Sequence, residues 1–128
     1  MTVIVCLDDN LGMSFGGRRQ SRDSAVCADI VQMADGAAIT MDERSKMLFE
    51  GLDANIADNG EFYFAEFESP NALMQSADGL VIYRWNRRYP ADLRFDVSLE
   101  GWQLCKASEF AGTSHEKITK EVYICEDE

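Results

Sequence analysis

Arginine is the residue type whose placement in this sequence points most clearly to chemistry. Seven of the 12 basic residues fall in two short stretches, Arg18, Arg19 and Arg22 in the first and Arg84, Arg87, Arg88 and Arg94 in the second. A guanidinium group binds a phosphate or carboxylate through two parallel hydrogen bonds. We therefore expect five of them to be ligand-binding residues for a small anion: Arg18, Arg19, Arg22, Arg87 and Arg88. The alternative is that these arginines pair with surplus acids such as Asp92 and Asp96.

Two other groups of polar side chains could carry chemistry. Asp8, Asp9 and Asn10 offer clustered oxygen ligands for a divalent cation, but the spacing of a calcium-binding loop is absent, and we favour a solvated turn after a strand. His115 is the one histidine in the chain, which excludes metal centres built from several histidines. As a proton shuttle it has no serine or cysteine that the sequence assigns to it, so we favour a histidine at the end of a hairpin. No metal is predicted.

The elements that would position these residues alternate between strands and helices. Residues 2–7 form a β-branched strand, and a polar loop with three glycines follows it. Ser21 is the expected N-cap of a helix that runs to Gly36, with Asp23 in its first turn. A short apolar strand at 37–41 precedes a second helix at 43–49, which Thr40 and Glu43 open as a capping box.

The second half of the chain predicts mostly strands. We expect strands at 62–67 and 80–85, a short helix at 70–77 between them, and an arginine-rich loop at 86–94. Residues 102–110 and 118–125 read as two strands of a hairpin. Together these elements predict an α/β fold in which helices pack on a mixed sheet.

Composition limits the class of protein. The 128 residues are 46% hydrophobic, enough for one core, so we expect a single domain over 1–128. The net charge of −11 argues against direct nucleic-acid binding, and no apolar run is long enough to span a membrane. Four isolated cysteines suit buried, reduced thiols, and with no leader-like segment we expect a cytoplasmic protein, its acidic tail of Glu126, Asp127 and Glu128 aiding solubility.

The order of elements and several motifs resemble the dihydrofolate reductase-like family. The first strand and the loop after it, residues 3–13, are similar to the family's first strand and active-site loop. Residues 38–41, with Ser45 in the next helix, resemble its second strand and the following helix. The best match is the closing stretch, which carries Leu80 to Trp85, Asp92, Phe95, Asp96, Trp102, Ser108 to Phe110, Ser114, His115 and Tyr123 in family order.

The resemblance implies a dihydrofolate reductase-like mixed sheet with flanking helices and a C-terminal antiparallel hairpin, reduced in size because residues 51–60 replace a family strand and helix. It implies that the two arginine loops are neighbours. It also places Asp23 where family members keep the catalytic carboxylate that binds the pterin ring. The residues alone favour another reading of Asp23, an acid stabilised by the amino end of a helix.

The cofactor side departs from the family pattern. Asp42 and Glu43 stand where members carry a glycine and an arginine for the cofactor phosphate, and Glu68 and Ser69 replace paired glycines near the pyrophosphate. We therefore predict no cofactor. The sequence favours a non-catalytic binding or interaction protein over an enzyme, with a small anionic or nucleotide-like ligand or a protein partner. The alternatives are a divergent NADPH-dependent reductase of a pterin-like substrate, and an acidic decoy that inhibits a nucleic-acid-binding protein.

Overall fold

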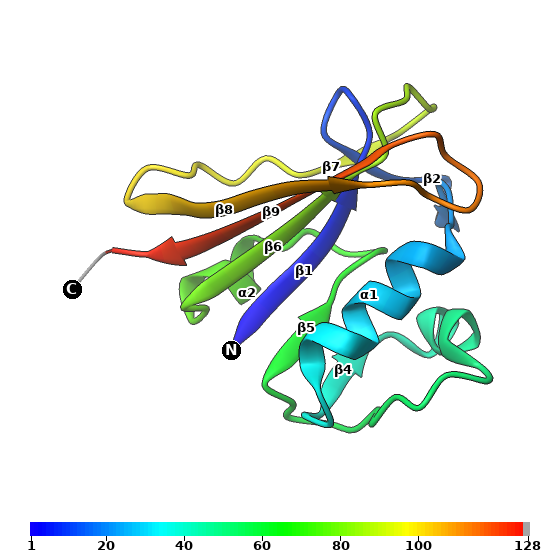
Figure 1. Cartoon of the computed structure of the whole chain (residues 1–128). Coiled ribbons are helices and arrows are strands. Elements are labelled where there is room, and N and C mark those ends of the chain that lie inside the picture. Colours follow the sequence, from blue (N-terminus) through cyan, green and yellow to red (C-terminus); the bar gives the residue numbers. More distant parts are fainter. Residues whose placement is uncertain (127–128) are drawn as a thin grey trace.

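A six-stranded mixed sheet forms the centre of the molecule in the computed structural model, which describes residues 1–126 (Figure 1). Asp127 and Glu128 of the acidic tail lie outside the described residues. The strands, in spatial order, are β4 (Ile39–Met41), β5 (Phe62–Phe64), β1 (Thr2–Leu7), β6 (Gly79–Arg84), β9 (Ile118–Cys125) and β8 (Trp102–Phe110). The first four are parallel, and β9 and β8 are antiparallel to their neighbours. This is the α/β arrangement that the sequence predicts.

Helices and loops cover both faces of this sheet. Helix α1 (Ser24–Ala34) packs on one face, where Ile30 meets Ile4 and Tyr83 in one buried cluster. The short helix α2 (Asn71–Gln75) contributes Met74 to a second cluster on the other face, with Val5 of β1. Alternate residues of β1 thus point into different cores, as the period of a strand requires. None of the helices in residues 1–126 is long and apolar enough to span a membrane.

A second, three-stranded sheet was missing from the prediction. It consists of β3 (Arg18–Arg19), β2 (Gly12–Phe15) and β7 (Leu93–Arg94), in that order. The expected glycine-rich loop is therefore a hairpin, in which Gly16 and Gly17 turn with φ of 59° and 74°. Strands this short carry no periodic signal, and β2 pairs with β7 across most of the chain.

The two expected helix caps were wrong in position. Helix α1 begins one residue after Asp23, whose side chain accepts a hydrogen bond from the N–H of Ala25, so Asp23 and not Ser21 is its N-cap. The second helix is a 3-10 helix, η1 (Glu43–Phe49), capped by Asp42. Thr40 lies in β4 and its hydroxyl donates to the carbonyl of Ala57. In both places a neighbouring aspartate supplies the cap, because its carboxylate is as good an acceptor as a hydroxyl.

Candidate functional site

The two arginine loops lie side by side, as the resemblance implies. Ser14 of β2 pairs with Leu93 of β7, and the backbone N–H of Gly16 lies 3.1 Å from a carboxylate oxygen of Asp92. The buried carboxylate of Asp8 adds a third connection, because it accepts hydrogen bonds from the N–H of Gly12 at 2.7 Å and of Tyr89 at 2.9 Å. Asp8 therefore fixes both loops to the end of β1.

The contacts of Asp8 bear on the possible cation site at the end of the first strand. Both of its oxygens are taken by backbone N–H groups, of Asn10 and Gly12 on one oxygen and of Tyr89 on the other. Within residues 1–126 there is no cluster of three or more His, Cys, Asp or Glu side chains able to hold a metal ion. The carboxylate of Asp8 therefore binds the backbone of the two arginine loops.

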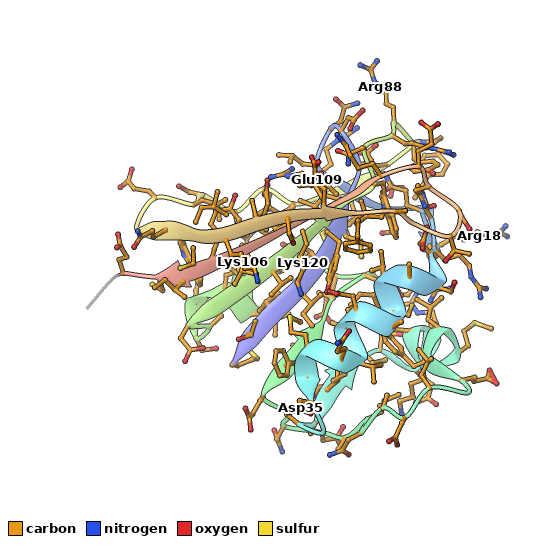
Figure 2. All side chains as sticks on the ribbon, viewed as in Figure 1. Arg18, Asp35, Arg88, Lys106, Glu109 and Lys120 are labelled. Atoms are coloured by element: carbon orange, nitrogen blue, oxygen red, sulfur yellow. The ribbon has the colours of Figure 1, made fainter. Side chains whose placement is uncertain are left out.

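The seven arginines divide into two groups. Arg19 forms a two-pronged ion pair with Glu66, with nitrogen–oxygen distances of 2.8 and 2.9 Å, and Arg84 pairs with Glu121 at 2.9 Å. For the other five there is no ion pair with any residue of 1–126: Arg18, Arg22, Arg87, Arg88 and Arg94. In Figure 2 the side chains of Arg18 and Arg88 extend away from the ribbon into solvent, in different directions.

The alternative, in which the arginines pair with acids, holds for Arg19 and Arg84, but their partners are Glu66 and Glu121 and not Asp92 or Asp96. Asp92 accepts from the N–H of Gly16, and Asp96 accepts from the side-chain amide of Asn71 at 3.1 Å. These acids satisfy neighbouring polar groups of the chain, so the exposed arginines keep their charge unneutralised.

Asp23 lies at the centre of a buried cluster that joins the amino end of α1 to the loop between β8 and β9. One of its oxygens accepts from the N–H groups of Ala25 at 2.9 Å and Thr113 at 2.8 Å. The other accepts from the N–H of Ser114 at 2.8 Å and lies 2.9 Å from Nδ1 of His115. A carboxylate has about four acceptor positions, and the chain itself fills them here.

The protonation of Asp23 follows from these contacts. Burial alone would raise its pKa, but hydrogen bonds from the Thr113 backbone, the His115 ring and the Ser114 and Ala25 backbone outweigh burial and lower the pKa to about 2. Asp23 is therefore ionised at neutral pH. It then requires a hydrogen on Nδ1 of His115, which directs the second ring nitrogen, Nε2, toward other partners.

Those partners are two hydroxyl groups. Nε2 of His115 lies 2.9 Å from the hydroxyl of Tyr89 and 3.1 Å from Oγ of Ser21, and the Ser21 hydroxyl donates to that of Tyr89 over 3.2 Å. The imidazole ring stacks on Trp85 with ring centres 4.6 Å apart and planes 19° apart. Asp23 and His115 are buried, whereas Ser21 and Tyr89 are half-buried, so the polar cluster runs from the interior to the surface.

Gly112 leaves room for this cluster. A Cβ atom at Gly112 would lie 2.5 Å from a carboxylate oxygen of Asp23 and 2.7 Å from the carbonyl oxygen of His115. A side chain there would push the hairpin loop away from the helix. The close approach of loop and helix thus depends on the absence of a side chain at this position.

Near the residues that the resemblance places on the cofactor side, several side chains contact one another. Beyond the carboxyl end of β5, Glu66 binds Arg19 and also accepts from the hydroxyl of Ser45 at 2.7 Å. The guanidinium of Arg44 lies 4.1 Å from the ring centre of Phe67 and binds the carboxylate of Asp42. Asp42 and Glu43, singled out in the sequence, lie at the start of η1, and the carboxylate of Glu43 pairs with Lys46.

The sequence assigned no serine or cysteine to His115, and the structure places two hydroxyl groups beside it in addition to Asp23. Ser21 is 94 residues away from His115 along the chain, and Tyr89 is 26 away. Their residue types did not indicate a contact with His115, because serine and tyrosine are common in loops.

Comparison with known proteins supports the architecture. Neither a protein-family model nor a curated protein sequence matches the chain. Among solved structures, it is similar to dihydrofolate reductase from Enterococcus faecalis complexed with NADP(H) and RAB-propyl, with a TM-score of 0.67 and 10% identity, over 98% of this chain and 96% of that one. Identity this low reports on the fold alone. The chain has a dihydrofolate reductase-like fold.

Proposed function

We propose that this chain binds a small anionic ligand, a phosphate or carboxylate compound, at its two arginine loops and does not reduce a pterin with a nicotinamide cofactor. The observation that carries the proposal is the set of exposed arginines without ion-pair partners in residues 1–126, on a chain with a net charge of −11. On such an acidic surface, arginines without acidic partners are the groups able to hold an anion.

The loops that carry these arginines are held in place before any ligand arrives. Backbone pairing of Ser14 with Leu93, and the contacts of Asp8 with Gly12 and Tyr89, fix one loop against the other. Preorganised loops lose less conformational freedom on binding, which favours affinity for a small ligand. Arg87 and Arg88 directly precede Tyr89, and Arg22 directly follows Ser21, so three of the guanidinium groups leave the backbone next to the hydroxyl pair.

The second half of the proposal rests on two groups of contacts. The carboxylate of Asp23 already accepts from four donors of its own chain, so a pterin ring would have to displace His115 or a backbone N–H to reach it. At the end of β5, Glu66 is engaged by Arg19 and Ser45. A phosphate-bearing cofactor at that edge would find Arg19 already bound to Glu66 and Arg44 already bound to Asp42, so neither guanidinium is free to hold it.

Isothermal titration with pyrophosphate and with a dicarboxylate tests anion binding. We expect saturable binding that weakens as salt is raised, and a loss of roughly tenfold or more in affinity for the pair Arg87→Gln and Arg88→Gln. Arg18→Gln and Arg22→Gln test the first loop in the same way. Lys106→Gln, which removes one positive charge on β8, is the matched control for the single variants Arg18→Gln and Arg22→Gln (Figure 2).

Thermal unfolding in the presence of NADPH separates the proposal from the reductase alternative. We expect no increase in Tm with NADPH under conditions where pyrophosphate raises it, because binding to the native state alone raises Tm. Saturable stabilisation by NADPH that survives the arginine substitutions would overturn the proposal in favour of a cofactor-binding protein.

A further inference from the structure

We propose that Ser21 is a nucleophile activated by His115 and Asp23, and that the chain hydrolyses small carboxylic esters. The choice of an ester that also carries a negative charge rests on the proposed anion-binding function, whereas the nucleophile itself does not. Ser21 lies in the loop before α1, Asp23 is the N-cap of α1, and His115 lies in the loop between β8 and β9.

The geometry is that of a nucleophile, a base and an orienting acid. Oγ of Ser21 lies 3.1 Å from Nε2 of His115, and Nδ1 of the same ring lies 2.9 Å from Oδ2 of Asp23. Both distances are within the range in which an imidazole accepts a hydroxyl proton and a carboxylate fixes the ring. The acid and the base are buried and the hydroxyl is half-buried, so a substrate meets the nucleophile first.

The contacts of the imidazole suit this assignment. Asp23 is ionised and lies against Nδ1 of His115, and Nε2 on the other side of the ring faces the hydroxyl groups of Ser21 and Tyr89. Stacking on Trp85 holds the plane of the imidazole. When His115 takes up a proton from Ser21, the resulting imidazolium lies against the Asp23 carboxylate, which stabilises its charge.

Tyr89 is the competing hydroxyl at the same nitrogen. Its oxygen lies 2.9 Å from Nε2, and Ser21 donates to it at 3.2 Å, so in the resting arrangement Tyr89 shares the base with Ser21. Ser21 and Tyr89 are both half-buried, so exposure does not tell the two hydroxyls apart, but Ser21 is the donor and Tyr89 the acceptor of the hydrogen bond between them. We assign to Tyr89 the role of positioning the Ser21 hydroxyl. Substitutions of Ser21 and of Tyr89 should therefore have different effects.

The reaction balances without any redox partner. Oγ of Ser21 attacks the ester carbonyl carbon while its proton passes to Nε2 of His115. The bond from that carbon to the leaving oxygen then breaks, and the proton on Nε2 moves to the departing alcohol. Water attacks the acyl-Ser21 ester, giving its proton to Nε2, and the carboxylic acid product leaves as Ser21 regains the proton.

Hydrolysis of 4-nitrophenyl acetate by the full chain tests the nucleophile. Ser21→Ala and His115→Gln are each expected to lower turnover roughly 100-fold or more, the usual contribution of a positioned base. Ser24→Ala is the matched control, because the Ser24 hydroxyl donates to that of Thr113 over 2.8 Å and forms no hydrogen bond with His115 within residues 1–126. Tyr89→Phe removes the hydroxyl that positions Ser21 but leaves Ser21 beside Nε2 of His115, so turnover should fall less than in Ser21→Ala or His115→Gln.

Covalent labelling locates the reacting oxygen. A fluorophosphonate probe is expected to add once, and peptide mass spectrometry should place the adduct on Ser21 in the wild type and in Tyr89→Phe, with none in His115→Gln. An adduct confined to Tyr89, absence of any adduct, or unchanged turnover in a folded Ser21→Ala variant would overturn the assignment.

A second substrate separates this inference from the proposed function. The mono-4-nitrophenyl ester of glutaric acid carries a carboxylate, and we expect it to be turned over more efficiently than the acetate ester, with the advantage lost in the Arg87→Gln, Arg88→Gln pair. Equal turnover of both esters through Ser21 would retain the nucleophile and refute the anion site. Pyrophosphate binding without a Ser21 adduct would refute the nucleophile and retain the anion site.

Discussion

His115 and Asp23, 92 residues apart in the chain, are joined by a contact of 2.9 Å between Nδ1 and Oδ2. Their side chains are 2% and 0% exposed. An ionised carboxylate without water needs its hydrogen bonds from the protein, and Asp23 obtains four of them. This pair is the structural centre of the candidate site, and several measurable consequences follow from it.

Replacing Asp23 with asparagine should destabilise the fold strongly. The amide keeps one acceptor oxygen and turns an N–H₂ group toward donors, so we expect a loss of about 3 kcal/mol in the free energy of unfolding. Asp42→Asn is the matched control: it is also an N-cap with a pKa lowered to about 2, by its hydrogen bonds with Arg44, but its side chain is 34% exposed.

Asp42→Asn should cost less than about 1 kcal/mol, as exposed pairs do. Urea unfolding followed by circular dichroism measures both variants. Equal losses in the two would show that the Asp23 cluster adds no more than a surface helix cap.

Stability should fall as the solution is acidified, in a window set by Asp23. Its pKa is about 2 in the folded chain and near the ordinary value of 3.8 when unfolded, so the unfolded state binds protons first. The stabilisation is complete above about pH 4 and is lost as pH falls toward about 2, amounting to about 2.5 kcal/mol. Urea midpoints measured over this range should drop more steeply for the wild type than for Asp23→Asn; parallel curves would contradict the assignment.

Two adjacent arginines should behave differently. Arg19 is 16% exposed and holds the 9%-exposed Glu66 with two hydrogen bonds, so Arg19→Ala leaves a carboxylate without its cation and should cost about 2–4 kcal/mol. Arg18 is exposed and has no ion pair within residues 1–126, so Arg18→Ala should change stability by less than about 0.5 kcal/mol. Thermal unfolding of the two variants measures this difference. A similar Tm for both would show that the Arg19–Glu66 pair does not stabilise the fold.

The four thiols should differ in reactivity. Burial, with a smaller contribution from Glu66, raises the pKa of Cys27 to about 11, and burial also raises the pKa of Cys6. Cys105 is exposed on β8. A thiol-reactive disulfide reagent should therefore react fastest with Cys105, and Cys105→Ser should remove the fast phase. Rapid modification of Cys27 in the native protein would show that α1 opens readily.

The sequence predicted the main sheet because its strands are long or strongly apolar. Residues 102–110 and 118–125 were predicted as strands with the bounds observed for β8 and β9, and the first strand agreed as well. Cys105 was expected to be buried and is exposed, because β8 is an edge strand and alternation alone does not tell an edge from a centre.

The candidate site was predicted only in part. Proximity of the two arginine loops followed from the family resemblance, and the structure agrees. The pairing of Arg19 with Glu66, and of His115 with Ser21, joins residues from distant parts of the chain. Such pairs depend on how the loops pack, and no local pattern in one sequence encodes them. Asp23 was recognised as important, but its cap position was missed because Ser21 is an equally good cap by residue type.

The contacts of Asp23 with Thr113, Ser114 and His115 also bear on how the chain folds. The amino end of α1 reaches its final arrangement only when the last hairpin has returned across the sheet, since these donors lie 90 to 92 residues further along. Closing so long a loop is slow compared with forming a helix turn. We expect the contacts among Ser21, Asp23 and His115 to form in the last stage of folding, so a nascent chain that has not yet added residues 113–115 lacks the donors that hold Asp23.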